Sequence, residues 1–290
     1  MPIASTQPPA SVANSTVQQR AYEQSYSSSI DGYGFPDRKI ADGVELRGKT
    51  ILSVGCGTSN DVWYLSRDND VIGLDYALSG LRAGSECGVR GVAADLNFHP
   101  SLPFRSGAFD LVVLKDILEH VLAPLDILKE AHRILKPGGA VVLSLPNHFY
   151  LPMRLRILFG QGLIFKSFYS DHREIYREWD YMHIRFFTYR GVRSFLREAG
   201  LRPEKWFWDF GSLAHYFNPD MWLEPQLWKK RNGHPLSGRA RIGLYGLRPL
   251  WTVFNIVFPR RLREWIVSIA PGLLSAGFYV RARKTNGEAQ

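Results

Sequence analysis

The sequence predicts an α/β protein built on a doubly wound, mostly parallel sheet. Between residues 50 and 146, short apolar runs with β character alternate with amphipathic stretches. Two glycines, Gly55 and Gly57, directly follow the first of these runs. No period of about 20–50 residues recurs, which excludes a repeat array. Strand and helix signals that alternate in this way are typical of a parallel sheet covered by helices.

Strands are expected over residues 50–54, 70–75, 91–95, 109–116 and 140–146. The fourth is a continuous apolar run, which suits a strand buried on both faces. Helices are expected over residues 79–87 and 124–135, the second beginning at Pro124 and stopping at the Lys-Pro-Gly-Gly of residues 136–139. Ligands of such sheets bind beyond the carboxyl ends of the strands, so side chains there are candidates for a site.

Further elements are expected on either side: a helix over residues 17–26, an amphipathic helix beside the site within residues 146–165, and strands over residues 202–210 and 275–284. Residues 186–201 predict another helix, with Thr188 as its N-cap and Gly200 just past its end. The residues between the last two strands do not fit the alternation.

The sequence Gly55-Cys56-Gly57 forms a glycine corner after the first strand. Glycines allow positive φ there and leave no side chain in the way of a ligand. The dinucleotide fingerprint G-x-G-x-x-G fails at its third glycine, where Asn60 stands, and the Lys-Ser/Thr pair of a phosphate loop is missing. A diphosphate ligand is therefore disfavoured, and a nucleoside without phosphates fits better.

Acidic residues end the next two strands. The carboxylate of Asp75 can accept hydrogen bonds from both hydroxyls of a ribose. Asp95 can accept from an exocyclic amine, and Leu96 can cover the face of a purine. Each acid alone could be a solvated residue at a strand end, but their succession after a glycine corner favours a nucleoside site.

Five stretches occur in order between residues 50 and 147: ILSVGCGTSN, IGLDYA, AADLN, FDLVVLKDILEHV and ILKPGGAVVLSLPN. They resemble the successive motifs of class I S-adenosylmethionine-dependent methyltransferases. The resemblance implies a Rossmann-like seven-stranded sheet, whose reversed last strand would be residues 275–284. It implies S-adenosylmethionine as the cofactor, with Gly55 and Gly57 at its methionine part, Asp75 at the ribose, Asp95 and Leu96 at the adenine, and Lys115 approaching from below.

The residues after the fourth strand would face the methyl group of the cofactor. A hydroxyl acceptor must lose its proton, and His120 is the first candidate base because an imidazole titrates near working pH. Glu119 or Asp116 could orient it. The alternative is that Glu119 and His120 cap the following turn and only shape the pocket. His148 and His183 are expected on the substrate side.

Asp116, Glu119 and His120 also resemble the Glu-x-x-Glu-His cluster of ubiquinone-biosynthesis O-methyltransferases, which can hold a divalent metal. Two carboxylates and a histidine suit a metal ion. The first acid is Asp in this sequence, and we expect no metal.

The amino-acid composition limits the classes of protein to which this chain can belong. Residues 1–20 are rich in Ser, Thr, Pro, Gln and Ala and read as a disordered arm, not as a signal peptide. Two cysteines argue against a disulfide framework or structural zinc and fit a reducing compartment such as the cytoplasm. The expected divisions are the arm, a methyltransferase core over residues 21–208, a basic aromatic insertion or lid over residues 209–274, and a last strand with a tail over residues 275–290.

Positive charge is concentrated in the last third. The net charge is +9, and residues 202–290 hold 14 Lys/Arg against 6 Asp/Glu. Residues 225–263 hold nine Lys/Arg and no acid, among many aromatic and aliphatic residues. This mixture suits an anionic membrane surface, and the alternative is a lid with an outward basic face. No RNA-binding module is recognisable, so nucleic acid is a disfavoured partner.

We therefore expect a cytoplasmic methyltransferase, peripheral at the inner membrane face, that methylates a small or lipid-linked acceptor at oxygen. Two alternatives remain. One is a non-catalytic methyltransferase-like partner of a biosynthetic enzyme, to which residues 146–165 show a local likeness. The other is an RNA methyltransferase, although the Asn/Asp-Pro-Pro-aromatic turn of nucleobase amino-methylating enzymes is missing after the fourth strand.

Overall fold

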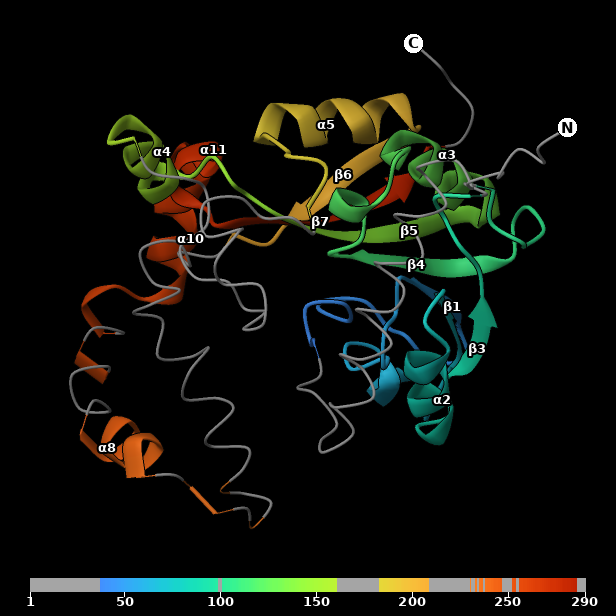
Figure 1. Cartoon of the computed structure of the whole chain (residues 1–290), viewed down its shortest axis with the longest axis horizontal. Coiled ribbons are helices and arrows are strands. Elements are labelled where there is room, and N and C mark those ends of the chain that lie inside the picture. The colour runs from blue at the N-terminus through green and yellow to red at the C-terminus, as the bar shows by residue number, and fades with distance from the viewer. Residues whose placement is uncertain are drawn as a thin grey trace, which may run out of the picture.

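The computed structural model describes residues 37–98, 101–160, 183–208, 230, 233, 235–236, 238–246, 252–253 and 256–285. The arm expected over residues 1–20 and the helix expected over residues 17–26 lie outside the described residues. The described part is built around one sheet of seven strands with helices on either side (Figure 1).

The strands are β1 (Thr50–Val54), β2 (Asp70–Asp75), β3 (Arg90–Ala93), β4 (Phe109–Lys115), β5 (Leu135–Pro146), β6 (Leu201–Trp206) and β7 (Gly277–Lys284). Their order across the sheet is β3-β2-β1-β4-β5-β7-β6. The strands β1 to β5 pair in parallel, whereas β7 runs antiparallel to both of its neighbours. The doubly wound fold, the seven strands and the reversed last strand are therefore confirmed.

The helices are η1 (Trp63–Leu65), α2 (Leu78–Glu86), η2 (Leu118–His120), α3 (Pro124–Ile134), α4 (Leu151–Leu158), α5 (Tyr189–Glu198), α8 (Gly238–Gly246), α10 (Arg260–Ile269) and α11 (Pro271–Leu274). Figure 1 shows α3 and α5 on one side of the sheet and α2 on the other. It also shows α4, α10 and α11 beyond one end of the sheet, with α8 farther away.

The start of β5 differs from the expectation. The Lys-Pro-Gly-Gly of residues 136–139 should separate helix and strand, but β5 begins before it and includes it. Pairing with β4 shifts register between Phe109 and Leu111, and Gly138 has a φ of +73°. A Cβ on Gly139 would lie 3.0 Å from the carbonyl oxygen of Lys136. The two glycines therefore allow an irregular backbone within the strand, and they do not separate it from the preceding helix.

The central strand β4 is buried on both faces, as its apolar run predicts. Val112 and Leu114 belong to the core that lies under α3 and α5. Leu111 and Val113 belong to the core on the other face, together with Ile40 from the segment before β1. The sheet thus separates two apolar cores, which is the arrangement expected for parallel strands.

The uncharged run after Glu264 is divided among three elements. The helix α10 ends at Ile269, α11 begins at Pro271, and β7 begins at Gly277. Among the described residues, no helix combines the length and apolar character that spanning a bilayer requires.

The helix α5 begins at a side-chain cap, as predicted. The Oγ1 atom of Thr188 accepts a hydrogen bond from the backbone N–H of Gly191 over 3.1 Å. Gly200, just past the end of the helix, has a φ of +73°, as its expected role requires.

We expect Thr188→Ala to lower the free energy of unfolding by about 1 kcal/mol, because an N–H group in the first turn of α5 loses its acceptor. Thr188→Ser keeps the hydroxyl and should change this free energy by less than about 0.5 kcal/mol. Urea denaturation followed by circular dichroism measures both. Equal losses in the two variants would contradict the capping role.

Candidate functional site

The glycine corner lies at the carboxyl ends of β1 and β2. Gly55 and Gly57 have φ values of +67° and +49°, as expected for this turn. The N–H group of Gly55 donates to the carbonyl oxygen of Leu74 in β2 over 2.7 Å. A Cβ on Gly55 would lie 2.5 Å from Cδ1 of Ile117. The corner therefore also packs against the loop after β4, a contact that sequence spacing does not reveal.

Asp75 fastens the end of β2 to this corner. Its side chain is 5% exposed. One carboxylate oxygen accepts from the N–H of Gly57 over 2.8 Å, and the other accepts from the N–H of Ala77 over 2.9 Å. Each carboxylate oxygen has two lone pairs, so the group can serve the backbone and a ligand together. Its role at the ribose stays a prediction.

Asp95 and Leu96 follow β3 at the same edge of the sheet. Oδ1 of Asp95 accepts from the N–H of Asn97 over 2.9 Å, and Oδ1 of Asn97 accepts from the N–H of Leu122 over 2.7 Å. Leu96 is 8% exposed and belongs to the apolar core. The loop after β3 is thus tied to the segment after β4. Contact of Asp95 and Leu96 with an adenine stays a prediction.

Lys115 ends β4 and is held by two carboxylates. Its Nζ atom lies 2.5 Å from Oδ1 of Asp61 and 3.2 Å from Oδ2 of Asp37. Burial lowers the pKa of Lys115, but the charges of Asp61 and Asp37 outweigh this and raise it above its ordinary value. Sequence reasoning missed both acids, because neither lies in a recognisable motif. The predicted approach of Lys115 to the cofactor stays a prediction.

The three candidate catalytic residues do not form one group. Asp116 is exposed and has a φ of +49°, and its Oδ1 accepts a hydrogen bond from Oγ of Ser144 in β5 over 2.8 Å. Glu119 and His120 lie in η2, and the side chain of Glu119 is 1% exposed. The side chain of Asp116 is therefore hydrogen-bonded to β5 at the protein surface, whereas the side chain of Glu119 lies in the interior.

A segment that is distant in the sequence packs beside Glu119 and His120. The N–H groups of Ile184 and Arg185 donate to the carbonyl oxygen of Glu119 over 2.9 Å and 3.2 Å. These two hydrogen bonds dock the segment before α5 onto η2. They bring His183 beside the predicted catalytic pair.

Glu119, His120, His148 and His183 form a Glu–His cluster. Nε2 of His183 lies 3.9 Å from Oε1 of Glu119, and the rings of His183 and His120 are 4.7 Å apart between centroids. Nδ1 of His183 lies 3.0 Å from Nε2 of His148. The sequence placed His148 and His183 near the substrate but gave no sign of their contact with Glu119.

Cys56 lies inside the glycine corner. Burial, followed by the charge of Asp75, raises the pKa of its thiol to about 12. A Cβ on Gly73 of β2 would lie 2.7 Å from Sγ of Cys56, so the thiol packs closely on that strand. A protonated, buried thiol is a poor nucleophile, and Cys56 acts in packing.

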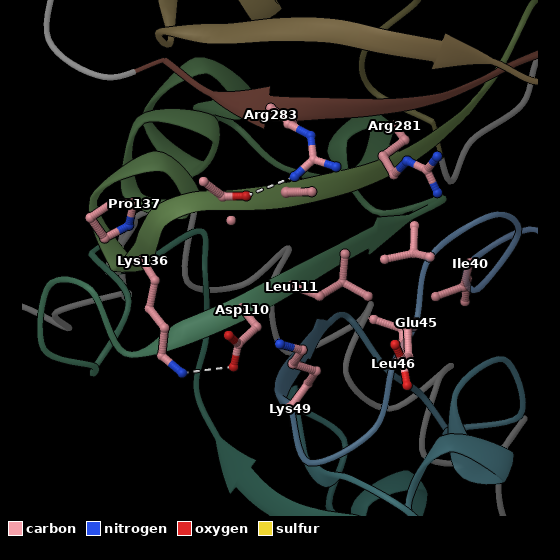
Figure 2. Close-up of a pocket in the computed structure, with 14 residues that line it drawn as sticks. Ile40, Glu45, Leu46, Lys49, Asp110, Leu111, Lys136, Pro137, Arg281 and Arg283 are labelled. Carbon is pink, nitrogen blue, oxygen red and sulfur yellow. Dashed lines mark hydrogen bonds and ion pairs between the residues drawn. The ribbon is translucent and has the colours of Figure 1, made fainter.

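A separate cavity of about 300 Å³ opens at the opposite, amino-terminal edge of the sheet (Figure 2). Its charged lining includes Lys49, Asp110, Lys136 and Arg283. Nζ of Lys136 lies 2.7 Å from Oδ2 of Asp110, and Arg283 donates to the carbonyl oxygen of Gly138 over 3.0 Å. Ligands of parallel sheets bind at the carboxyl edge, so we assign these contacts a structural role and not a role in ligand binding.

Comparison with known proteins agrees with the geometry. Residues 52–143 match a family model described as a methyltransferase domain. The chain is 32% identical over 123 residues to the ubiquinone biosynthesis O-methyltransferase of Psychrobacter arcticus, covering 40% of this chain and 48% of that protein. It is 33% identical over 117 residues to the demethylmenaquinone methyltransferase of Lactococcus lactis subsp. lactis, covering 38% and 46%. The chain thus spans about half the length of these curated relatives.

The crystal structure of the [4+2]-cyclase SpnF has a similar fold, with a TM-score of 0.55 at 18% identity, covering 98% of this chain and all of that one. A likeness at this identity shows the fold alone. The matched model and the motifs agree that residues 52–143 form a methyltransferase domain. The predicted resemblance to S-adenosylmethionine-dependent methyltransferases, and the cofactor that it implies, are confirmed for this domain. The acceptor does not follow from the family.

Calorimetric titration with S-adenosylhomocysteine tests the role of Asp75. We expect Asp75→Asn to weaken binding about 10–100-fold, because a hydrogen bond to a charged group contributes roughly 1.5–3 kcal/mol. Asp70→Asn is the matched control, since Asp70 lies on the same strand but is exposed and paired with Arg90. Parental affinity in a folded Asp75→Asn variant would remove Asp75 from the site.

Proposed function

We propose that this chain transfers the methyl group of S-adenosylmethionine to an oxygen atom of a small or lipid-linked acceptor. The observation that supports this most is the position of the Glu–His cluster. Its residues Glu119 and His120 follow β4, while the glycine corner follows β1 and Asp75 is the last residue of β2. These three strands are neighbours and run in parallel, so cofactor and proton acceptor would share one edge of the sheet.

The reaction requires alignment and removal of one proton. The acceptor oxygen bonds to the methyl carbon while the carbon–sulfur bond breaks, and sulfur keeps the electron pair in S-adenosylhomocysteine. Alignment alone can lower the barrier by about 7–11 kcal/mol, and a general base contributes about 10²–10⁴-fold. The hydroxyl proton passes to His120, and the buried carboxylate of Glu119 stabilises the imidazolium that forms.

The names of the relatives favour a quinone-type acceptor. One is a ubiquinone biosynthesis O-methyltransferase and another a demethylmenaquinone methyltransferase. Reduced quinone rings carry hydroxyl groups, and ubiquinone and menaquinone carry lipid tails. An acceptor of this class would supply both the oxygen nucleophile and a reason to work at a membrane.

The helix α10 presents an apolar stripe to solvent beside a cation. Arg261, Trp265 and Ile269 follow one another at intervals of four residues and therefore share one face. Trp265 is 61% exposed and Ile269 65%, whereas Val267 on the opposite side is buried. Large apolar side chains beside arginine suit the boundary between lipid headgroups and acyl chains.

The helix α4 and the residue after it show the same combination. Leu158 and Phe159 are about three-quarters exposed, at 74% and 75%, and Arg154 is exposed nearby in the helix. Figure 1 places α4 and α10 at the same end of the molecule. We propose that this end binds an anionic membrane peripherally, where a lipid-linked acceptor would be found.

Transfer of tritiated methyl groups from S-adenosylmethionine in a cell extract tests the acceptor class. We expect label in extracted lipid or in small aqueous metabolites. His120→Ala should reduce incorporation about 10²–10⁴-fold, the usual contribution of a general base.

Label recovered in RNA would replace the proposal with an RNA methyltransferase. Equal, background-level incorporation by the parent and by His120→Ala, with S-adenosylhomocysteine still bound, would point to a non-catalytic partner protein.

Sedimentation with vesicles tests the membrane surface. We expect binding to vesicles that contain phosphatidylglycerol but not to neutral phosphatidylcholine vesicles. Replacing both Trp265 and Ile269 by Ser should lower the bound fraction at least tenfold, since burying each side chain contributes roughly 1.5–3 kcal/mol. Leu78→Ser is the control, because Leu78 is 48% exposed on α2, away from this end. An equal effect of the control, or equal binding to neutral vesicles, would refute the surface.

A further inference from the structure

A groove lies between the first turns of α3 and α5, two helices that cover the same side of the sheet (Figure 1). Its volume is about 360 Å³. Because α3 connects the parallel strands β4 and β5, its first turn lies at the carboxyl edge of the sheet, where the cofactor and the acceptor are expected. We call this cavity the α3–α5 groove, and its lining includes Pro124, Leu125, Arg185, Phe186, Phe187 and Phe195.

Aromatic and aliphatic side chains make up most of this lining. Phe187 is buried, Phe195 is half-buried, and their rings meet edge to face at 5.8 Å between centroids. Phe187 belongs to the apolar core and Phe195 packs against it, so both rings are held in place from below. Phe186 is exposed beside them, and Leu125 of α3 is half-buried. The groove therefore offers apolar surface for a ligand to cover.

Hydrogen bonds to the backbone engage polar side chains of the same lining. Nη2 of Arg185 donates to the carbonyl oxygen of Leu122 over 2.8 Å, and Oγ1 of Thr188 accepts from the N–H of Gly191 over 3.1 Å. The first of these bonds joins the segment before α5 to the segment before α3, so it also holds the two sides of the groove together. Asp126, the acid of the lining, is exposed to solvent. The groove is thus preformed, as a binding site needs to be.

The α3–α5 groove adjoins the Glu–His cluster. The ring of Phe186 lies 4.8 Å from the ring of His148 between centroids, with the two planes nearly perpendicular. The N–H group of Arg185 donates to the carbonyl oxygen of Glu119, while the side chain of Arg185 lines the groove. A ligand whose polar head lies at the cluster would therefore enter the groove by passing Phe186.

We propose that the α3–α5 groove binds an apolar tail of the acceptor while the reacting hydroxyl group lies at the Glu–His cluster. This inference rests on the proposed function and extends it by locating the tail. A volume of about 360 Å³ is near the lower end of ligand pockets, which hold about 300–1,000 Å³. The groove therefore suits a short alkyl chain or the first part of a longer one.

The groove would select among acceptors that carry the same hydroxyl group. An alkyl substituent that enters it leaves water, which stabilises the complex roughly in proportion to the apolar area that is buried. A polar substituent would lose its water against the aromatic walls, at a cost in free energy. Acceptors with an alkyl tail should therefore bind more tightly than unsubstituted or polar ones.

A series of alkylhydroquinones tests the groove by the length of the alkyl chain. Methyl-, propyl- and pentylhydroquinone are titrated calorimetrically into the full chain saturated with S-adenosylhomocysteine. We expect affinity to rise about two- to fourfold with each added methylene, because full burial of one methylene is worth about fourfold, or about 0.8 kcal/mol. Methyl transfer to the same compounds should show the same trend in KM with kcat unchanged, which is the signature of uniform binding.

Leu125→Trp fills the groove from α3. It should weaken binding of pentylhydroquinone at least tenfold and leave binding of methylhydroquinone within about twofold of the parent. Arg197→Trp is the matched control, because Arg197 is exposed on α5 and does not line the groove. Equal effects of the two variants would overturn the proposal. If Leu125→Trp does not fold, the series on the parent still decides, since equal affinity for all the chain lengths would refute the groove.

Binding and methyl transfer, measured on the same samples, keep the two proposals apart. Methyl transfer with an affinity that does not depend on chain length would refute the groove alone. Length-dependent binding that Leu125→Trp removes, without methyl transfer to these compounds or to a cell extract, would support the groove and contradict the proposed methyl transfer.

Discussion

The two hydrogen bonds of the Asp75 carboxylate are the constraint on which the candidate site depends. They connect the end of β2 to Gly57 and to Ala77, the residue directly before α2. Because β1 lies between β2 and β4, the same corner packs on Ile117, and η2 follows directly. The relation between the glycine corner and the pair Glu119 and His120 is therefore fixed by buried strands and not by mobile side chains.

The strands were predictable because their signals are local. A continuous apolar run gives β4, and alternating elements before it give the parallel order. The beginning of β5 was not predictable, because a Gly-Gly pair that can end a helix also permits an irregular strand. Only pairing with β4 decides between these outcomes, and pairing is a tertiary interaction.

The candidate site could be predicted where each residue follows a strand. Gly55, Gly57 and Asp75 lie at strand ends that any doubly wound sheet would bring to one edge. The contact between His183 and Glu119 could not be predicted, because it rests on backbone hydrogen bonds between segments far apart in sequence. Asp37 and Asp61 were missed for the same reason, since ion pairs with Lys115 leave no local pattern.

The place of β7 in the sheet has a consequence for biosynthesis. This strand pairs with β5 on one side and β6 on the other, yet it follows both in the chain. On the ribosome, β5 therefore keeps an open edge and β6 has no neighbour until residues 277–284 have emerged. An unpaired apolar edge is a template for intermolecular pairing, so the nascent polypeptide would rely on chaperones longer than a sheet completed in chain order.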